Sequence, residues 1–260
     1  TQWSRLAPRY LRKEFALTKE VKRATAHIAG MGLYELFING QRIGEQVLAP
    51  APTDYRKTIL YNTYDVTPQL RKENAIGVIL GNGRFYTMRQ NYKPYKIPTF
   101  GYPKLRLNLI VEYTDGSRQT IASDISWKLT TEGPIRSNNE YDGEEYDARK
   151  ELGDWNRTGY DDTNWISAQR VSIPSGTLRA QMIPGMKVTE SLKPVSIRKQ
   201  GGKHILDIGQ NMAGWLRIRI KGQAGDSIRL RFAERLQPDG EIFTKNLRDA
   251  HCTDIYVVSG

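Results

Sequence analysis

The sequence predicts an all-β protein made of two consecutive antiparallel β-sandwich domains of the jelly-roll kind, the second of them incomplete. Three observations predict this class. Apolar residues recur at every second position, tight-turn pairs such as Asn-Gly and Asp-Gly separate the alternating segments, and helical periodicity is weak throughout. Many short strands with turns at close spacing favour sandwiches over a parallel sheet.

Two hairpins are expected in the first half of the chain from their turn residues. The alternating segment Tyr34–Ile38 is followed by Asn39 and Gly40 and then by a short strand that begins at Gln41. The second alternating segment is KLRLNLIVEY (104–113), which runs into an Asp-Gly pair and returns as RQTIAS. Asparagine or aspartate followed by glycine tolerates the positive φ angles that a two-residue hairpin needs.

A third hairpin is expected near the end of the chain. The segments LRIRIKG (216–222) and SIRLRFAERL (227–236) alternate apolar and basic residues on either side of a Gln-Ala-Gly-Asp turn. If these strands pair, their apolar residues enter a core, and the opposite surface of the sheet carries Arg217, Arg219, Arg229 and Arg231. Such a basic surface is either exposed to solvent or serves to dock another domain or an anionic ligand.

The chain is expected to divide near residues 173–187. This stretch contains Pro174, Gly176, Pro184 and Gly185, and strand-like patterning resumes after it. We therefore expect a first sandwich over residues 1–172, a linker over 173–187 and a second sandwich over 188–260. The second sandwich stops on the strand-like IYVVSG, and a strand there leaves an unpaired edge, so we expect it to be incomplete.

Composition narrows the classes of partner. The formal net charge is +11, but lysine and arginine are spread along the whole length, which disfavours nucleic acid as a partner. No run approaches about 18 consecutive apolar residues, so no membrane-spanning helix is expected. A single cysteine, Cys252, excludes an internal disulfide and a cysteine-rich zinc site. The compartment stays open, with a periplasmic or extracellular location favoured over the cytoplasm.

A sugar-binding cluster is one candidate site. The stretch LGNGRFY (80–86) combines an amide, a guanidinium and two aromatic rings at a strand end, where its glycines let the backbone turn. Sugar hydroxyls need hydrogen bonds, and the C–H face of a sugar stacks on rings. The simpler alternative is a mixture of core and edge contacts. The candidate sugar-binding residues are Asp54, Tyr55, Asn82, Arg84, Phe85 and Tyr86.

The acidic stretch SNNEYDGEEYDARKE (137–151) is the second candidate. Carboxylates at this density could supply oxygen ligands to calcium, or an acid/base pair for glycoside hydrolysis. The ligand spacing of a helix-loop-helix calcium site is absent. No metal site is assigned, but Asp142 and Glu144 are the candidate ligands and calcium is the one cofactor considered. The alternative interpretation is a solvated strand and turn.

Several segments, taken together, resemble bacterial α-L-rhamnosidases of glycoside hydrolase family 78. The first sandwich carries LYELFINGQRIGEQVLAPAPTDYRKTILYNTYDVT, NAIGVILGNGRFY, EYDGEEYDAR and GYDDTNW. The second carries LDIGQNMAGWLRIRIKGQAG and LRFAERLQPDGEIFTKNLRDAHCTDIYVVSG. The pattern from Trp155 to Trp165 is by itself generic to sandwich domains of sugar-processing enzymes, but the joint set is specific.

The resemblance implies a larger inverting enzyme that releases terminal non-reducing α-L-rhamnose from glycans or glycosides. In that family both catalytic carboxylates lie in an (α/α)6 helical barrel after the sandwiches, so no catalytic residue is expected in this chain. Some members also bind rhamnose with calcium in an accessory sandwich. We therefore expect a non-catalytic N-terminal scaffold that recognises a rhamnose-containing carbohydrate. The alternative is a self-sufficient, lectin-like carbohydrate-binding module without hydrolase activity.

Overall fold

The computed structural model describes residues 6–87, 100–248 and 250–260. Its strands are β1 (Arg9–Ala16), β2 (Val21–Met31), β3 (Leu33–Ile38), β4 (Gln41–Arg42), β5 (Thr58–Asp65), β6 (Glu73–Gly81), β7 (Lys104–Tyr113), β8 (Arg118–Ala122), β9 (Lys128–Thr130), β10 (Ile135–Asn139), β11 (Gly143–Asp147), β12 (Ile166–Ser167), β13 (Thr177–Ala180), β14 (Ser196–Gln200), β15 (Lys203–Asp207), β16 (Ser227–Arg231) and β17 (Thr253–Val257). Short 3₁₀ turns are η1 (Thr67–Gln69), η2 (Gly83–Phe85), η3 (Ala148–Lys150) and η4 (Lys245–Leu247). Within the described ranges, no helix is long and apolar enough to cross a membrane.

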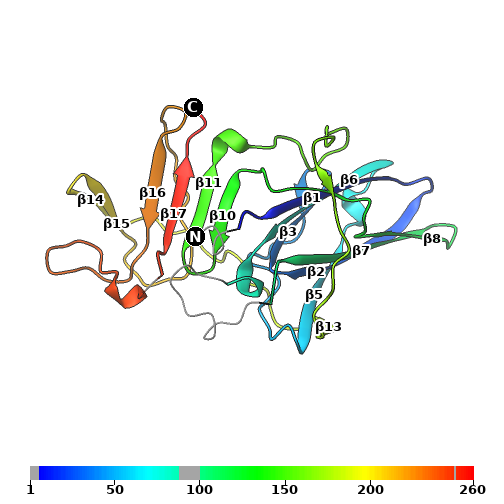
Figure 1. Cartoon of the computed structure of the whole chain (residues 1–260), viewed down its shortest axis with the longest axis horizontal. Coiled ribbons are helices and arrows are strands. Elements are labelled where there is room, and N and C mark those ends of the chain that lie inside the picture. Colours follow the sequence, from blue (N-terminus) through cyan, green and yellow to red (C-terminus); the bar gives the residue numbers. More distant parts are fainter. Residues whose placement is uncertain (1–5, 88–99, 249) are drawn as a thin grey trace.

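Two sheets pack face to face to form the main sandwich (Figure 1). One sheet has the strand order β12-β9-β1-β6-β3-β4 and the other the order β13-β5-β2-β7-β8. Their facing sides carry the alternating apolar residues of each strand, among them the fully buried Ile28, Val78 and Leu107. Removal of this apolar surface from water is the main favourable contribution to folding. The all-β class and its antiparallel sandwich are confirmed.

Both early hairpins form as predicted. Asn39 and Gly40 take φ angles of 52° and 83° between β3 and β4. The Asn39 side chain also accepts a hydrogen bond from the backbone N–H of Ala75 (2.8 Å) and so ties the turn to β6. In the second hairpin Asp115 accepts the backbone N–H of Ser117 (2.9 Å), and β7 pairs with β8.

The third expected hairpin is wrong. The Gln-Ala-Gly-Asp turn forms, with the backbone N–H of Asp226 donating to the carbonyl of Gln223 (3.0 Å), but residues 208–226 lie outside any strand. β16 pairs antiparallel with β17 instead. Alternation identifies a segment that can form a strand but does not choose its partner. The four arginines therefore do not share one sheet surface. Arg229 and Arg231 lie on β16, whereas Arg217 and Arg219 precede the turn, outside any strand.

The segment expected as a linker contains a strand. β13 pairs in parallel with β5, with Thr177 opposite Thr58, and adds an edge strand to the five-stranded sheet. Residues 168–176 before it and 181–195 after it lie outside strands. The contiguous sandwich thus extends to residue 180, beyond the start of the Pro- and Gly-rich stretch that marked the expected boundary.

A further sheet joins the two parts of the chain. Its order is β10-β11-β17-β16, so β10 and β11 come from the first part and β16 and β17 from the second. The central pair is parallel, with Glu145 opposite Ile255 and Asp147 opposite Val257. Figure 1 shows this sheet (green, red and orange) beside the sandwich, followed by the small β14–β15 hairpin.

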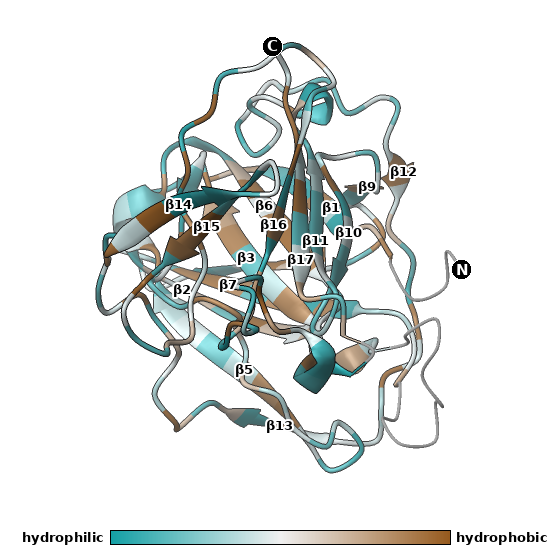
Figure 2. Cartoon of the chain, turned by 90° about the vertical axis from the view of Figure 1, so that its left-hand side faces the viewer, coloured by the Kyte–Doolittle hydropathy of each residue, from teal (hydrophilic) through white to brown (hydrophobic). Residues whose placement is uncertain are grey.

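The β14–β15 hairpin exposes apolar residues. Val195 and Ile197 are 69% and 62% exposed, and Trp215 beyond the hairpin is 57% exposed. Figure 2 shows brown, apolar segments on both strands. Exposed apolar surface of this kind is typical of a region that contacts more protein.

Candidate functional site

The six candidate sugar-binding residues lie close together, but most of them are buried. The side chains of Tyr55, Asn82, Phe85 and Tyr86 are at most 4% exposed. The Tyr55 ring meets the Phe85 ring edge-on at 4.9 Å between centroids, and burial raises the pKa of Tyr55 to about 12. Tyr55 also meets Phe100 at 5.1 Å. These rings form a small second core on the outer side of the five-stranded sheet, so they are not free to stack on a ligand.

The polar members of the cluster are bound within the chain. Asn82 donates to the backbone carbonyls of Leu6 and Asn138, both at 2.8 Å, and accepts from Arg9 at 3.2 Å. These bonds fasten the strand end at Gly81 to β10 and to the segment before β1. Amides placed in this way satisfy buried backbone groups, which is a structural role.

Two of the six residues reach solvent. The Arg84 side chain is 35% exposed and forms an ion pair with Glu140 at 2.9 Å. The Asp54 side chain is 32% exposed and pairs with Arg56 at 2.9 Å, and these hydrogen bonds lower its pKa. Sugar binding by the six residues stays a prediction, and only Asp54 and Arg84 offer accessible polar groups for it.

The acidic stretch forms contacts within the junction sheet. Asp142 is 6% exposed and accepts the backbone N–H of His251 at 3.2 Å. The backbone N–H of Glu144 donates to a carboxylate oxygen of Asp254 at 2.9 Å. In the part of the chain that the structure describes, no group of three or more His, Cys, Asp or Glu side chains could hold a metal. Calcium takes about six to eight oxygen ligands, more than two carboxylates supply, and calcium binding by Asp142 and Glu144 stays a prediction.

Glu144 of β11 has a strongly raised pKa in this junction sheet. The protein packed around it, with smaller effects of Asp254 and Glu35, raises the pKa of Glu144 to about 7, although its side chain still reaches solvent. Because the folded pKa lies above the ordinary value of 4.5, the folded state holds this proton more tightly than the unfolded state does. The resulting stability is present below pH 4.5 and is lost as the pH rises through 7.

Glu144→Gln should therefore gain stability relative to the original chain as the pH rises. Between pH 5.5 and 8 we expect the difference in unfolding free energy to change by on the order of 1 kcal/mol in favour of the variant, after allowance for solvent screening. Thermal unfolding at pH 5.5, 6.5 and 8 measures it. Glu112→Gln, at an exposed carboxylate paired with Arg118, is the control. A stability difference for Glu144→Gln that does not vary with pH would contradict the raised pKa of Glu144.

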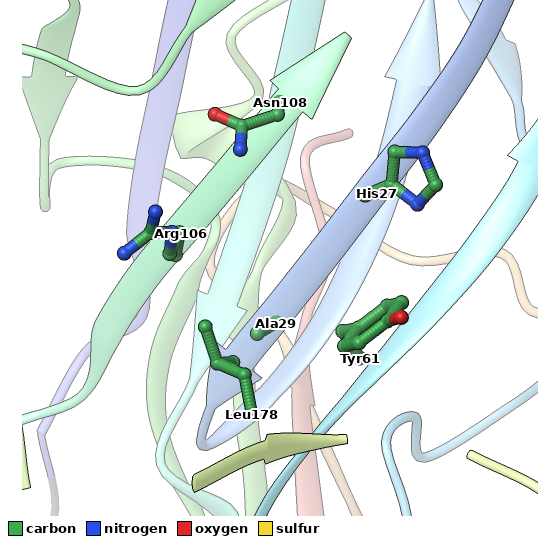
Figure 3. Close-up of a pocket in the computed structure, with 6 residues that line it drawn as sticks. All are labelled: His27, Ala29, Tyr61, Arg106, Asn108 and Leu178. Atoms are coloured by element: carbon green, nitrogen blue, oxygen red, sulfur yellow. The ribbon is translucent and has the colours of Figure 1, made fainter. Parts of the chain in front are cut away.

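A pocket opens on the outer face of the five-stranded sheet (Figure 3). Its lining residues are His27 and Ala29 of β2, Tyr61 of β5, Arg106 and Asn108 of β7, and Leu178 of β13. The sheet register places His27 opposite Asn108 and Ala29 opposite Arg106. His27 Nδ1 lies 3.0 Å from the hydroxyl of Thr63, and its ring meets Tyr61 edge-on at 6.0 Å. The pocket thus lies across four neighbouring strands, β13, β5, β2 and β7, and its lining combines polar and apolar side chains.

Sequence reasoning missed this pocket. Alternation along KLRLNLIVEY does put Arg106 and Asn108 on the face opposite the leucines. The pairing of β2 with both β5 and β7, and the addition of β13, could not be inferred from local patterns, because these strands are far apart in the sequence. Outward-facing polar residues near the middle of β7 were the available signal.

Comparisons with known proteins follow the same division of the chain. The family model for the alpha-L-rhamnosidase N-terminal domain matches residues 19–190, and the model for the bacterial alpha-L-rhamnosidase concanavalin-like domain matches residues 197–260. An α-L-rhamnosidase of Streptomyces avermitilis is 41% identical over an alignment of 276 positions, which covers 99% of this chain and 26% of the relative. One from Formosa agariphila is 40% identical over 240 residues, covering 90% of this chain and 25% of the relative.

Solved structures agree with these relatives. The α-L-rhamnosidase of Dictyoglumus thermophilum superposes with a TM-score of 0.90 at 42% identity, over 98% of this chain and 28% of that one. The Streptomyces avermitilis enzyme, solved in complex with L-rhamnose, superposes with a TM-score of 0.91 at 39% identity over 98% of this chain and 25% of that one. This chain thus spans about a quarter of the length of these relatives. The resemblance predicted from the sequence is confirmed: the chain belongs to the bacterial α-L-rhamnosidase family.

Proposed function

We propose that this chain is the non-catalytic N-terminal portion of an inverting α-L-rhamnosidase, which releases terminal non-reducing α-L-rhamnose from glycans or glycosides. The observation that carries the proposal is that it matches the N-terminal and concanavalin-like family models while spanning about a quarter of its relatives. The catalytic (α/α)6 barrel belongs to the remainder of such an enzyme. This portion serves as a scaffold and as a sugar-recognition module.

The carboxylates of this chain support a structural role. Inversion needs two carboxyl groups about 6.5–9.5 Å apart across a site open to sugar and water. The acidic groups around β11 are instead used in contacts within the chain. Glu140 pairs with Arg84, Asp147 pairs with Arg149 at 2.8 Å, and Asp142 binds the His251 amide. The pocket on the five-stranded sheet contains no carboxylate among its lining residues.

The purified chain is expected not to hydrolyse 4-nitrophenyl α-L-rhamnoside above the rate of a heat-denatured sample, because the described carboxylates around β11 are used in contacts within the chain. A full-length α-L-rhamnosidase, such as the Streptomyces avermitilis relative, is the positive control for substrate and buffer. Turnover that co-elutes with this chain through two different chromatography steps would contradict the placement of catalysis elsewhere.

A second candidate function, a self-sufficient carbohydrate-binding module, is favoured by the pocket of Figure 3. The two functions predict different behaviour when the chain is joined to a catalytic barrel of the family. A scaffold should be required for the barrel to fold as soluble, active enzyme, whereas a separable module should be dispensable for activity on small rhamnosides. The region equivalent to residues 1–190 is deleted from a full-length relative, and the 4-nitrophenyl α-L-rhamnoside assay is repeated. Loss of soluble, active enzyme supports the scaffold, and retained activity supports the separable module.

A further inference from the structure

Arg106 brings a positive charge to the pocket without an acidic partner. It lies on β7 opposite the buried Ala29, its side chain is exposed, and within the described ranges it makes no ion pair or side-chain hydrogen bond. Lys104, two residues earlier on the same face of β7, adds a second positive charge. An arginine guanidinium presents a planar fork of donors that matches a carboxylate better than any neutral group does.

The acidic side chains of this sheet face are committed elsewhere. Asp65 of β5 accepts hydrogen bonds from the N–H (3.0 Å) and hydroxyl (2.6 Å) of Thr67. Glu112 of β7 pairs with Arg118 at 3.2 Å and lies six residues from Arg106, roughly 20 Å along the strand. The pocket end of the face is therefore positive, and a ligand with a negative charge would complement it.

Neutral hydrogen-bonding groups lie beside this charge. Asn108 is the next outward residue on β7, and its side-chain amide makes no hydrogen bond in the described part of the chain. His27 lies directly opposite it, and its Nδ1 is engaged with Thr63 at 3.0 Å, which leaves Nε2 to interact with a ligand. An amide and an imidazole offer both donors and acceptors, as ligand hydroxyl groups require.

The rest of the lining is apolar. Ala29 is 2% exposed and forms the floor, while Leu178, 38% exposed, stands on the edge strand β13. Figure 3 shows Tyr61 on the other side of Ala29 from Leu178. A sugar ring has C–H groups on its faces and hydroxyl groups around its rim, so this mixture of an apolar floor and a polar rim matches it.

We infer that this pocket binds a single carboxylate-bearing sugar unit of a glycan. The carboxylate binds the guanidinium of Arg106, the hydroxyls bind Asn108 and His27, and the C–H face lies against Ala29 and Leu178. This recognition requires neither a metal nor catalysis by this chain. It stands on the pocket alone, and so it does not depend on the rhamnosidase function proposed above.

The test compares two ligands that differ only in the carboxylate. The ¹⁵N-labelled chain is titrated with methyl β-D-glucuronide and, separately, with methyl β-D-glucoside, and backbone amide shifts are followed by NMR. We expect shifts centred on β2, β5 and β7 around the pocket, and binding of the glucuronide at least about 10-fold tighter than that of the glucoside. Raising the salt concentration should weaken the glucuronide more than the glucoside.

Variants assign the effect to the pocket. Arg106→Gln should lower glucuronide affinity to the level of the glucoside, and because this side chain is exposed, the spectrum should remain that of the folded chain. Arg118→Gln, an exposed arginine of the neighbouring strand β8, is the matched control and should bind the glucuronide as the original chain does. Equal affinity for the two sugars, no loss in Arg106→Gln, or shifts elsewhere on the chain would each overturn the inference. Equally tight binding of acetate would overturn the sugar part of it. None of these outcomes changes the result expected in the 4-nitrophenyl α-L-rhamnoside assay, so failure of this inference can be distinguished from failure of the proposed function.

Discussion

Arg12→Met is expected to lower the free energy of unfolding by about 3 kcal/mol, which is among the largest effects of any exchange on the outer face of the six-stranded sheet. The side chain of Arg12 is 2% exposed beneath the loop 152–165. Its guanidinium donates to the backbone carbonyls of Trp155 (2.8 Å) and Arg157 (2.9 Å) and forms ion pairs with Glu14 and Asp162. This one buried side chain therefore bonds β1 to the loop at Trp155, Arg157 and Asp162.

Methionine has a similar length but no donors, so it leaves both loop carbonyls and the Asp162 carboxylate without their partner. An orphaned buried acceptor costs about 1–3 kcal/mol, and part exposure of Asp162 and Glu14 keeps the total near the lower end of the range for a broken buried pair. Urea unfolding followed by tryptophan fluorescence measures the loss, since Trp155 and Trp165 are buried residues of this loop.

The matched control for this exchange is Arg118→Met. The Arg118 side chain is 69% exposed and pairs with Glu112 at 3.2 Å, and an exposed pair contributes about 1 kcal/mol or less. If Arg12→Met cost no more than Arg118→Met, the loop would have to be held by its other contacts, which include aromatic pairs and the hydrogen bond from Gly40 N–H to the Asn156 carbonyl (3.0 Å). The aromatic pairs that join the loop to the sheet include the edge-on contacts of Trp155 with Tyr10 at 5.3 Å and with Phe37 at 5.9 Å.

The parts of the fold that follow from local chemistry were predictable from the sequence. The Asn39–Gly40 and Asp115–Gly116 turns require positive φ at glycine or asparagine and join strands that are neighbours in the sequence. Residues 216–222 show the limit of this reasoning. They alternate as well as β7 does, yet β16 pairs with β17, because pairing is decided by what else the fold brings to that edge.

The candidate site shows the same limit at the level of side chains. Asn82 and Phe85 have the chemistry of sugar recognition, but that chemistry also closes a buried loop, where an amide binds backbone carbonyls and a ring fills a core. Nothing in LGNGRFY distinguishes the two uses, and only burial does. Arg12 and Asp162 are 150 residues apart in the sequence and were equally hidden, because an ion pair of that separation leaves no local pattern.

Gly143→Ala is expected to loosen the junction between the two parts of the chain and to cost about 3 kcal/mol or more, from backbone strain and a steric clash together. Gly143 is the first residue of β11 and has a φ of +102°, a backbone angle that residues other than glycine rarely adopt. A Cβ atom there would lie 2.7 Å from Asp254 Oδ1 and closer still to the carbonyl oxygen of Thr253. These neighbours are backbone and side-chain atoms of β17, so relief requires β11 and β17 to move apart.

The change should be local, and hydrogen exchange tests this. Amide protection is expected to fall in β16 and β17, which connect to the first part of the chain through the β11–β17 pair, and to stay unchanged in β2 and β7 of the sandwich. Gly116→Ala is the matched control, because Gly116 has a φ of +83° and open space where its Cβ would lie. The Gly116→Ala variant has the backbone strain of a positive φ but no steric clash, so we expect it to lower the free energy of unfolding by about 1 kcal/mol. Equal losses in the two variants would mean that strain alone matters at Gly143. A larger, junction-specific loss would mean that the contact between β11 and β17 holds the concanavalin-like part against the N-terminal sandwich.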